Sequence, residues 1–213
     1  MIKKVSIKDQ VYEKIKNRIL FREYKLGEQI TITKLSEELG ISNTPIREAM
    51  SRLEAEGLIN VTENSKYNVI VLGERDIIDL NEAVLAQVLA AIDICIKKDM
   101  VENLIERLSE AFEKHKTLYE SESKFDGKYI QVSIDFDRKI VEASENSFLI
   151  NIFNDLANRL ILCSIYNKSE FKDIHYNEHY NILESLKQGK YSKAIEYIKS
   201  HFTKDFDSMD IRK

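Results

Sequence analysis

The stretch that decides the fold is GISNTPIREAMSRLEAEGLI, residues 40–59 of a 213-residue chain. It holds the single proline of the chain, Pro45, directly before residues that are apolar at helical spacing. Thr44 is a natural N-cap, and Pro45 suits the first helical position because an N–H there has no helical partner. The pattern therefore predicts a helix that starts at Pro45 and ends at Gly57, with a buried stripe of Ile46, Ala49, Met50 and Leu53.

The residues before this stretch predict two further helices. Residues 6–21 are apolar in steps of four, which is typical of one face of an amphipathic helix. A short helix is expected over residues 34–39, capped by Thr33 and ended by Gly40 in the left-handed conformation that glycine tolerates. The face of the first helix that is expected to be buried consists of Ile7, Val11, Ile15 and Ile19.

The residues after the stretch predict a β-hairpin and then helices only. Two β runs, residues 58–62 and 67–72, flank a polar turn, and the order so far is that of a winged helix-turn-helix. Beyond Gly73 the sequence shows no convincing strand, so the fold class is mostly α. A bundle of six helices is expected over residues 76–97, 99–122, 126–144, 148–167, 173–188 and 191–207.

The charge is distributed unevenly along the chain. The net charge of −4 argues at first against a nucleic-acid partner. Residues 1–72, however, hold 12 Lys and Arg against 10 Asp and Glu, whereas the rest hold 20 against 26. This asymmetry indicates a basic module followed by an acidic one. A negative net charge does not exclude DNA binding, because the electrostatic field at the contact face matters more than the sum of the charges. We expect a DNA-binding domain over residues 1–72, a linker over 73–76 and an effector-binding and dimerisation domain over 77–213.

Other bulk features indicate an intracellular protein. No apolar stretch reaches the roughly 20 residues that span a bilayer, and the first residues lack the apolar core of a secretory signal. We therefore expect a cytoplasmic protein with no membrane partner. Cys95 and Cys163 lie in apolar helical stretches and are expected to be buried thiols in a reducing compartment.

The polar front of the helix in residues 40–59 suits the major groove of DNA. Ser42, Asn43 and Thr44 can donate to phosphates together with the exposed N–H groups of the helix start. Arg47 lies one turn in and is expected to point outward, where an arginine can reach guanine. The alternative is a surface arginine that pairs with Glu48 or Glu54. Lys34 and Lys66 can reach flanking phosphates, and Arg52 is a further candidate.

The motif TPIREAMSRLEAEGLI resembles the signature of the GntR family of bacterial transcription regulators. The layout of the whole chain resembles the FadR-type branch, which has a C-terminal FCD ligand-sensing domain. The resemblance implies DNA contacts by Lys34, Asn43, Thr44 and Arg47 and by the wing tip of Asn64, Ser65 and Lys66. It also implies a homodimer on a palindromic double-stranded operator. The family usually has arginine in place of Asn43 and glycine at the wing tip, which predicts an altered operator preference.

The second domain contains possible metal ligands. Ser133 and Asp137 are four residues apart, as are His175 and His179, so each pair shares a helix face. Each of these residues alone can equally be a surface or core-edge polar group. His201 lies on the last predicted helix.

Resemblance to FCD domains sharpens this prediction. Many of them hold a metal with an aspartate and a histidine four apart, and with two histidines on the last two helices. Here Ser133 and Asp137 stand at the first two positions, and His179 and His201 match the others. Asp137, His179 and His201 remain a sensible set for Zn²⁺, Ni²⁺ or Mn²⁺. Ser133, Arg159 and His175 are expected in the effector pocket.

Three functions are therefore compatible with the sequence. The first is a ligand-responsive transcription regulator, most simply a repressor, with an organic acid as the default effector class. Val84 stands where the family often has an arginine that would hold a carboxylate effector, so an apolar or differently anchored ligand, or none, is also compatible with the sequence. The second is a metalloenzyme that uses Asp137, His179 and His201, although no general base other than Glu178 adjoins them. The third is a winged helix used for protein contacts, against which the basic first helix argues.

Overall fold

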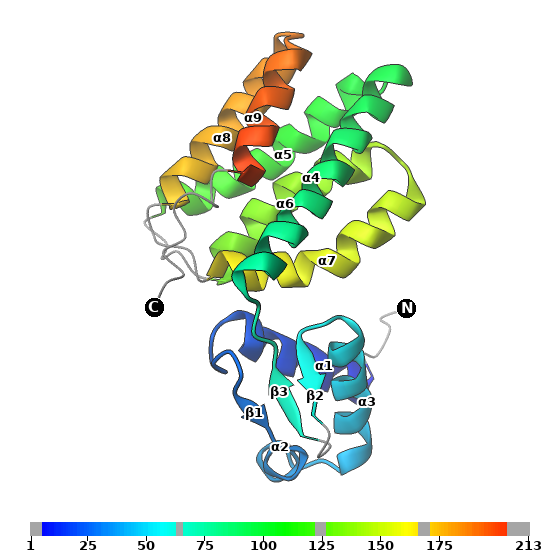
Figure 1. The fold of residues 1–213 in the computed structure, drawn as a ribbon, viewed down its shortest axis with the longest axis vertical. Coiled ribbons are helices and arrows are strands. Elements are labelled where there is room, and N and C mark those ends of the chain that lie inside the picture. The colour runs from blue at the N-terminus through cyan, green and yellow to red at the C-terminus, as the bar shows by residue number, and fades with distance from the viewer. Residues whose placement is uncertain (1–5, 63–65, 122–126, 166–170, 204–213) are drawn as a thin grey trace. The chain divides into compact units, whose positions relative to one another are not determined.

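The computed structural model describes residues 6–62, 66–121, 127–165 and 171–203, except for the side chains of Ile165 and Phe171. The chain forms two compact units, Met1–Val71 and Leu72–Lys213 (Figure 1).

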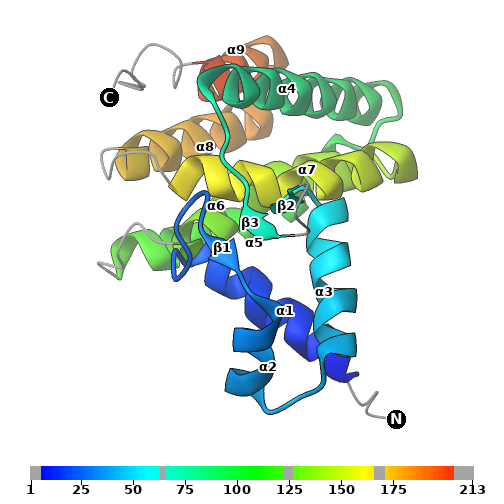
Figure 2. The ribbon, with the colours of Figure 1, turned by 60° about the horizontal axis from the view of Figure 1, so that its bottom comes forward.

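The first unit is a winged helix-turn-helix built from three helices and a small sheet. The sheet is antiparallel with strand order β1-β3-β2, and the register pairs Asn60 with Asn68 and Gln29 with Asn68. Figure 2 shows α2 and α3 joined by a short connection at one end of the unit. Its elements are α1 (Ile7–Leu20), β1 (Gln29–Ile30), α2 (Ile32–Leu39), α3 (Asn43–Ala55), β2 (Ile59–Val61) and β3 (Tyr67–Val69).

The predicted hairpin is confirmed, but the sheet differs in two respects. Strand β1 was not predicted, because two residues are too short to show an alternating pattern. The two predicted strands are also shorter than expected, since pairing in β2 and β3 covers three residues each.

The helix starts lie earlier than the sequence predicted. The N-cap of α3 is Ser42 rather than Thr44, so Pro45 is the third helical residue. Proline is still tolerated there, because the first four N–H groups of a helix have no internal partner. Likewise α2 is capped by Thr31 rather than Thr33. Gly40 does end α2 in the left-handed conformation, with a φ of 64°.

The core of the first unit is apolar and joins α1, α3 and the sheet. Ile7 was predicted to be buried, but its side chain is 60% exposed, because it lies in the first turn of α1. The α3 stripe is buried as predicted. The buried residues of α1 and α3 are Val11, Tyr12, Ile15, Ile19, Leu20, Ile46, Ala49, Met50 and Leu53.

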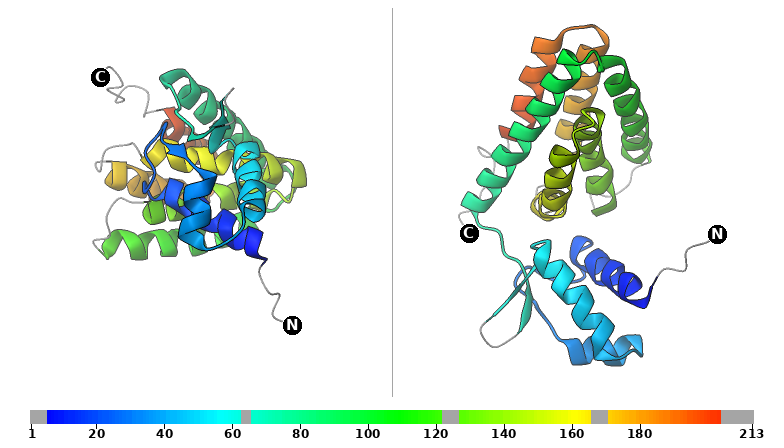
Figure 3. Two further views of the ribbon diagram at one scale, coloured as in Figure 1. Left: turned by 90° about the horizontal axis from the view of Figure 1, so that it is seen from below. Right: turned by 90° about the vertical axis from the view of Figure 1, so that its right-hand side faces the viewer.

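The second unit is an α-helical bundle, and the six predicted helices are present in the described part of the chain. Helix α6 packs against α4, α5, α7 and α8, while α9 packs against α8 and α4 (Figure 3). None of the described helices is long and apolar enough to span a bilayer. The helices are α4 (Glu74–Lys97), α5 (Val101–Glu120), α6 (Gly127–Ala143), α7 (Ser147–Ile165), α8 (Phe171–Lys187) and α9 (Tyr191–Thr203).

Candidate nucleic-acid interface and metal centre

The start of α3 presents unused hydrogen-bond donors to solvent. Ser42, Asn43 and Thr44 are all exposed. The Ser42 side chain makes no capping hydrogen bond, and the first turn of α3 holds no acidic residue. The positive end of the helix dipole and its N–H groups are therefore open to an anion such as a phosphate.

Arg47 is the exposed basic residue of the first turns of α3. It forms no ion pair with the residues that the structure describes, so the alternative of a paired surface arginine does not hold there. Glu48 instead lies 3.6 Å from Lys8, measured between the carboxylate oxygen and Nζ. Ile46 and Met50, on either side of Arg47 in the sequence, are fully buried. They anchor the helix in the core while the Arg47 guanidinium points outward.

The other predicted DNA contacts that the structure describes are all exposed, but one of them also contacts side chains of its own unit. Lys34 on α2 and Lys66 before β3 are exposed. Arg52 is held within the unit, because its guanidinium lies 3.6 Å from the centre of the Tyr12 ring and 3.2 Å from Glu56. The structure therefore gives Arg52 a role in the fold. The predicted wing-tip residues Asn64 and Ser65 lie outside the described residues.

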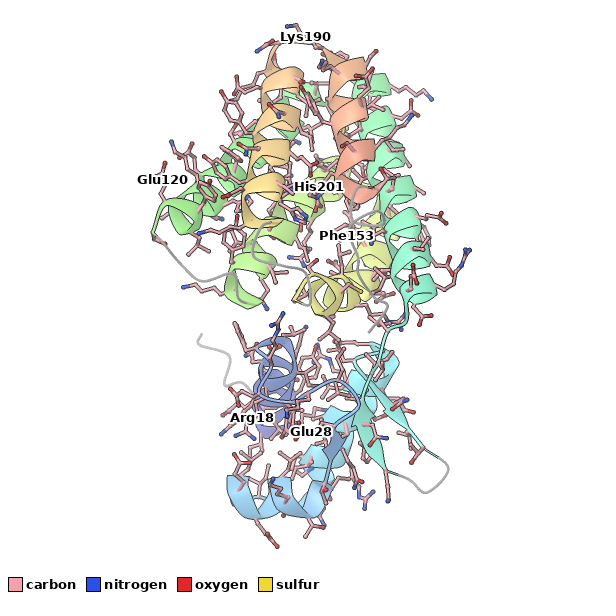
Figure 4. The ribbon with its side chains drawn as sticks, turned by 60° about the vertical axis from the view of Figure 1, so that its left-hand side comes forward. Arg18, Glu28, Glu120, Phe153, Lys190 and His201 are labelled. Atoms are coloured by element: carbon pink, nitrogen blue, oxygen red, sulfur yellow. The ribbon has the colours of Figure 1, made fainter. Side chains whose placement is uncertain are left out.

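Three of the predicted metal ligands meet inside the bundle. Asp137 comes from α6, His179 from α8 and His201 from α9, and all three are buried. His179 Nε2 lies 3.4 Å from His201 Nε2 and 3.8 Å from Asp137 Oδ1. His201 Nε2 lies 3.6 Å from Asp137 Oδ2. Figure 4 shows the labelled His201 among the helices of the bundle.

These separations fit one small divalent ion. Two ligand atoms at about 2.1 Å from a tetrahedral zinc lie about 3.4 Å apart. The buried Asp137 Oδ1 has no hydrogen-bond partner among the described residues, which is costly for a carboxylate oxygen and would be relieved by a cation. Two imidazoles and one carboxylate also suit nickel and manganese.

Glu178 fixes the orientation of His201. One of its carboxylate oxygens lies 2.8 Å from His201 Nδ1, so Nε2 is directed to Asp137 and His179. Burial lowers the pKa of His201, but the carboxylates of Asp137 and Glu178 outweigh it and raise that pKa to about 10. Because Glu178 is engaged with His201, it is not placed as the general base that a metalloenzyme would need.

His115 on α5 is a buried member of the cluster that the sequence analysis missed. Its Nδ1 lies 3.2 Å from His179 Nδ1, and its Nε2 lies 2.7 Å from the hydroxyl of Tyr129. Burial and the neighbouring histidines lower the pKa of His115 to about 3 and also lower that of His179. A signal was present in the sequence: His115 continues the apolar stripe of Leu104, Leu108, Ala111 and Phe112.

A cavity of about 30 Å³ adjoins Asp137 and His201, which is room for about one water. Ser133 and His175, which were expected in the effector pocket, line this cavity, and so do Asn81 and Ser164, which the sequence did not single out. Arg159 is not among its lining residues. The cavity is lined by Asn81, Ile130, Ser133, Ile134, Asp137, Leu160, Ser164, His175, His201 and Phe202.

Comparison with known proteins assigns both units. Residues 7–67 match the model of the bacterial regulatory proteins of the gntR family, and residues 81–204 match the FCD domain. The chain is 25% identical over 202 residues to "Uncharacterized HTH-type transcriptional regulator YdhC" of Bacillus subtilis, covering 94% of this chain and 89% of that protein. It is 25% identical over 200 residues to "Probable D-xylose utilization operon transcriptional repressor" of Paenarthrobacter nicotinovorans, covering 93% and 86%.

A solved structure, E. coli McbR/YncC, has the same fold. Its TM-score is 0.73 at 23% identity, over 96% of this chain and 97% of that one. The two matched models cover most of the chain, and the relatives are named as regulators of transcription. The chain therefore belongs to the GntR family of bacterial transcription regulators and carries an FCD domain.

Proposed function

We propose that this regulator binds a palindromic operator as a homodimer and represses transcription, and that an effector in the FCD domain changes its affinity for the operator. The observation that carries the proposal is the start of α3, where Arg47 is exposed and forms no ion pair with any described residue, and where the Ser42 side chain makes no capping hydrogen bond. Such a helix start can enter the major groove, and two half-sites on one duplex multiply the affinity of a single module.

Two further features support this function. Lys34 and Lys66 are exposed on the flanking elements, where cations can neutralise phosphates on either side of the groove. The relative from Paenarthrobacter is named as an operon repressor, which supports the repressor sign. Within the family we assign the chain to the FadR-type branch.

The test of DNA binding is selection from random duplex DNA with the full chain. We expect the recovered sequences to contain two inverted half-sites about one helical turn apart. Binding to a labelled duplex of that sequence should weaken steeply with salt, because phosphate neutralisation releases counterions. A single half-site, or no enrichment, would contradict the dimeric operator.

We further infer that Asp137, His179 and His201 hold a divalent ion in the FCD domain. Zn²⁺, Ni²⁺ and Mn²⁺ all accept this donor set. A bound ion would supply a positive centre for the carboxylate of an organic acid. Ser133 and His175 line the adjoining cavity and would contact the rest of such an effector.

The coupling between the two domains is proposed as a two-state equilibrium. Metal or effector in the bundle favours one relative placement of the two winged helices in the dimer, so the half-site spacing matches or mismatches the operator. Elemental analysis of the purified protein before and after dialysis against a chelator tests the metal. About one ion per chain, lost on chelation, is the expected result, and a metal-free protein that also takes up none of the three ions would contradict it.

A further inference from the structure

The buried histidines continue into a chain of hydrogen bonds that ends at a backbone carbonyl. From the metal centre outward, His179 Nδ1 lies 3.2 Å from His115 Nδ1, and His115 Nε2 lies 2.7 Å from the Tyr129 hydroxyl. The Tyr129 hydroxyl in turn donates to the carbonyl oxygen of Lys172 over 3.2 Å. These hydrogen bonds connect three helices, because His115 comes from α5, Tyr129 from α6, and Lys172 and His179 from α8.

The carbonyl at the end of this series of hydrogen bonds determines which group donates in each of them. A carbonyl oxygen can only accept a hydrogen bond, so the Tyr129 hydroxyl donates its proton to the carbonyl oxygen of Lys172. The phenol oxygen then accepts from His115 Nε2, which leaves His115 Nδ1 without a proton. His115 Nδ1 can in turn only accept, so His179 donates to it through Nδ1.

The consequence concerns Nε2 of His179, at the other end of this series of hydrogen bonds. A neutral imidazole carries one N–H, so a proton on Nδ1 leaves the lone pair of Nε2 free. His179 Nε2 is the atom that lies 3.8 Å from Asp137 and 3.4 Å from His201.

We propose that His115 and Tyr129 are positioning residues that hold His179 in the tautomer whose Nε2 is ready to bind a divalent ion. The inference rests on the proposed metal centre of Asp137, His179 and His201. His115 does not bind the ion itself. It acts on the ion through His179, in the way that outer partners of metal-bound histidines fix the tautomer and orientation of the ligand.

The first test measures the tautomers in the metal-free wild-type protein. The chain has four histidines, so ¹⁵N-histidine labelling with long-range ¹H–¹⁵N spectra gives few signals, which single substitutions assign. We expect the proton of His179 on Nδ1 and that of His115 on Nε2. The opposite assignment for either ring would overturn the proposal, whether or not the protein binds metal.

The second test uses two variants of similar shape. In His115→Asn the amide oxygen replaces Nδ1 as the acceptor for His179, whereas His115→Leu removes the acceptor. Zn²⁺ affinity, measured by competition with a chromophoric chelator, should fall about 10–100-fold in His115→Leu and stay near wild type in His115→Asn. Tyr129→Phe should also weaken binding, because His115 then loses the partner that fixes its own tautomer.

The outcomes separate the two proposals. If the wild type binds no Zn²⁺, Ni²⁺ or Mn²⁺, the metal centre fails, and the tautomer measurement still decides the hydrogen-bond chain. If the wild type binds metal and both His115 variants bind equally well or equally poorly, the positioning role is wrong while the metal centre stands. Thermal unfolding of each metal-free variant separates a loss of fold from a loss of affinity.

Discussion

The two units of this protein place their functional side chains in opposite environments. In the winged helix the candidate residues Ser42, Asn43, Thr44 and Arg47 are exposed, and an apolar core behind α3 holds them. In the bundle Asp137, His179 and His201 are buried and form part of the core. Substitutions at the surface site should therefore change function alone, whereas substitutions at the buried site should change function and stability together.

The largest effect is expected from Asp137→Ala. Loss of a direct ligand should lower metal affinity by more than the roughly 100-fold limit for an outer-shell residue. It should also reduce the unfolding free energy of the metal-free protein by about 3 kcal/mol, the typical cost of breaking a buried ion pair. Metal titration and urea unfolding measure the two effects. Asp135→Ala on the same helix, which breaks a half-buried pair with Arg138, is the control and should retain the metal.

The next effect is expected from Arg47→Ala. If Arg47 reads a base as proposed, its loss should weaken binding to the selected operator by about 10–100-fold. The melting temperature should not change, because Arg47 is exposed and pairs with no described residue. Fluorescence anisotropy and thermal unfolding test both statements. Arg75→Ala removes the same charge from α4, where the arginine pairs with Asp79, and should leave operator affinity unchanged. Equal losses in both variants would mean that overall charge, rather than the start of α3, determines binding.

A smaller effect is expected from Tyr12→Phe, which tests the core behind α3. The Tyr12 hydroxyl donates to Glu56 at 2.7 Å, and the Arg52 guanidinium lies over the ring. Removing the hydroxyl should lower the unfolding free energy by about 1 kcal/mol, because its hydrogen bonds with Glu56 and Lys16 are lost while the ring stays in place. A much larger decrease in the unfolding free energy, measured by urea unfolding, would contradict the view that this hydroxyl adds only a modest contribution to the stability of the unit.

The smallest effect concerns the thiols of the bundle. Cys95 and Cys163 are buried, and burial raises the pKa of Cys95 and raises that of Cys163 to about 12. At pH 8 both should react with an alkylating reagent only when the bundle opens. Mass spectrometry after a timed reaction should find neither thiol modified in the native protein and both modified in urea. Rapid native labelling would contradict a closed bundle.

In the first unit, some elements were predictable from the sequence and others were not. Helix α3 and its buried stripe were predictable because the spacing of apolar residues reports which face of a helix is buried. Strand β1 was missed because pairing with β3, rather than local pattern, makes it a strand. The start of α3 was misplaced by two residues because Ser42, Asn43 and Thr44 are all acceptable caps.

The proposed metal centre was predictable in part. Asp137, His179 and His201 were grouped through family resemblance, since spacing alone does not say which helices are neighbours. His115 was missed because it belongs to a helix that supplies no ligand, although its place on an apolar stripe marked it as buried. The partnership of Glu178 and His201 likewise depends on the packing of α8 against α9.

The size of the cavity beside Asp137 and His201 has a mechanical consequence. A space of about 30 Å³ accepts a water or a single small group, so an organic acid of several carbons needs more room than is present. Protein interiors resist compression, so such a guest has to displace side chains of α4, α6, α7, α8 or α9 on entry. Under the proposed function, binding of an effector would therefore move whole helices, and the tight packing of the bundle would link the effector to that movement.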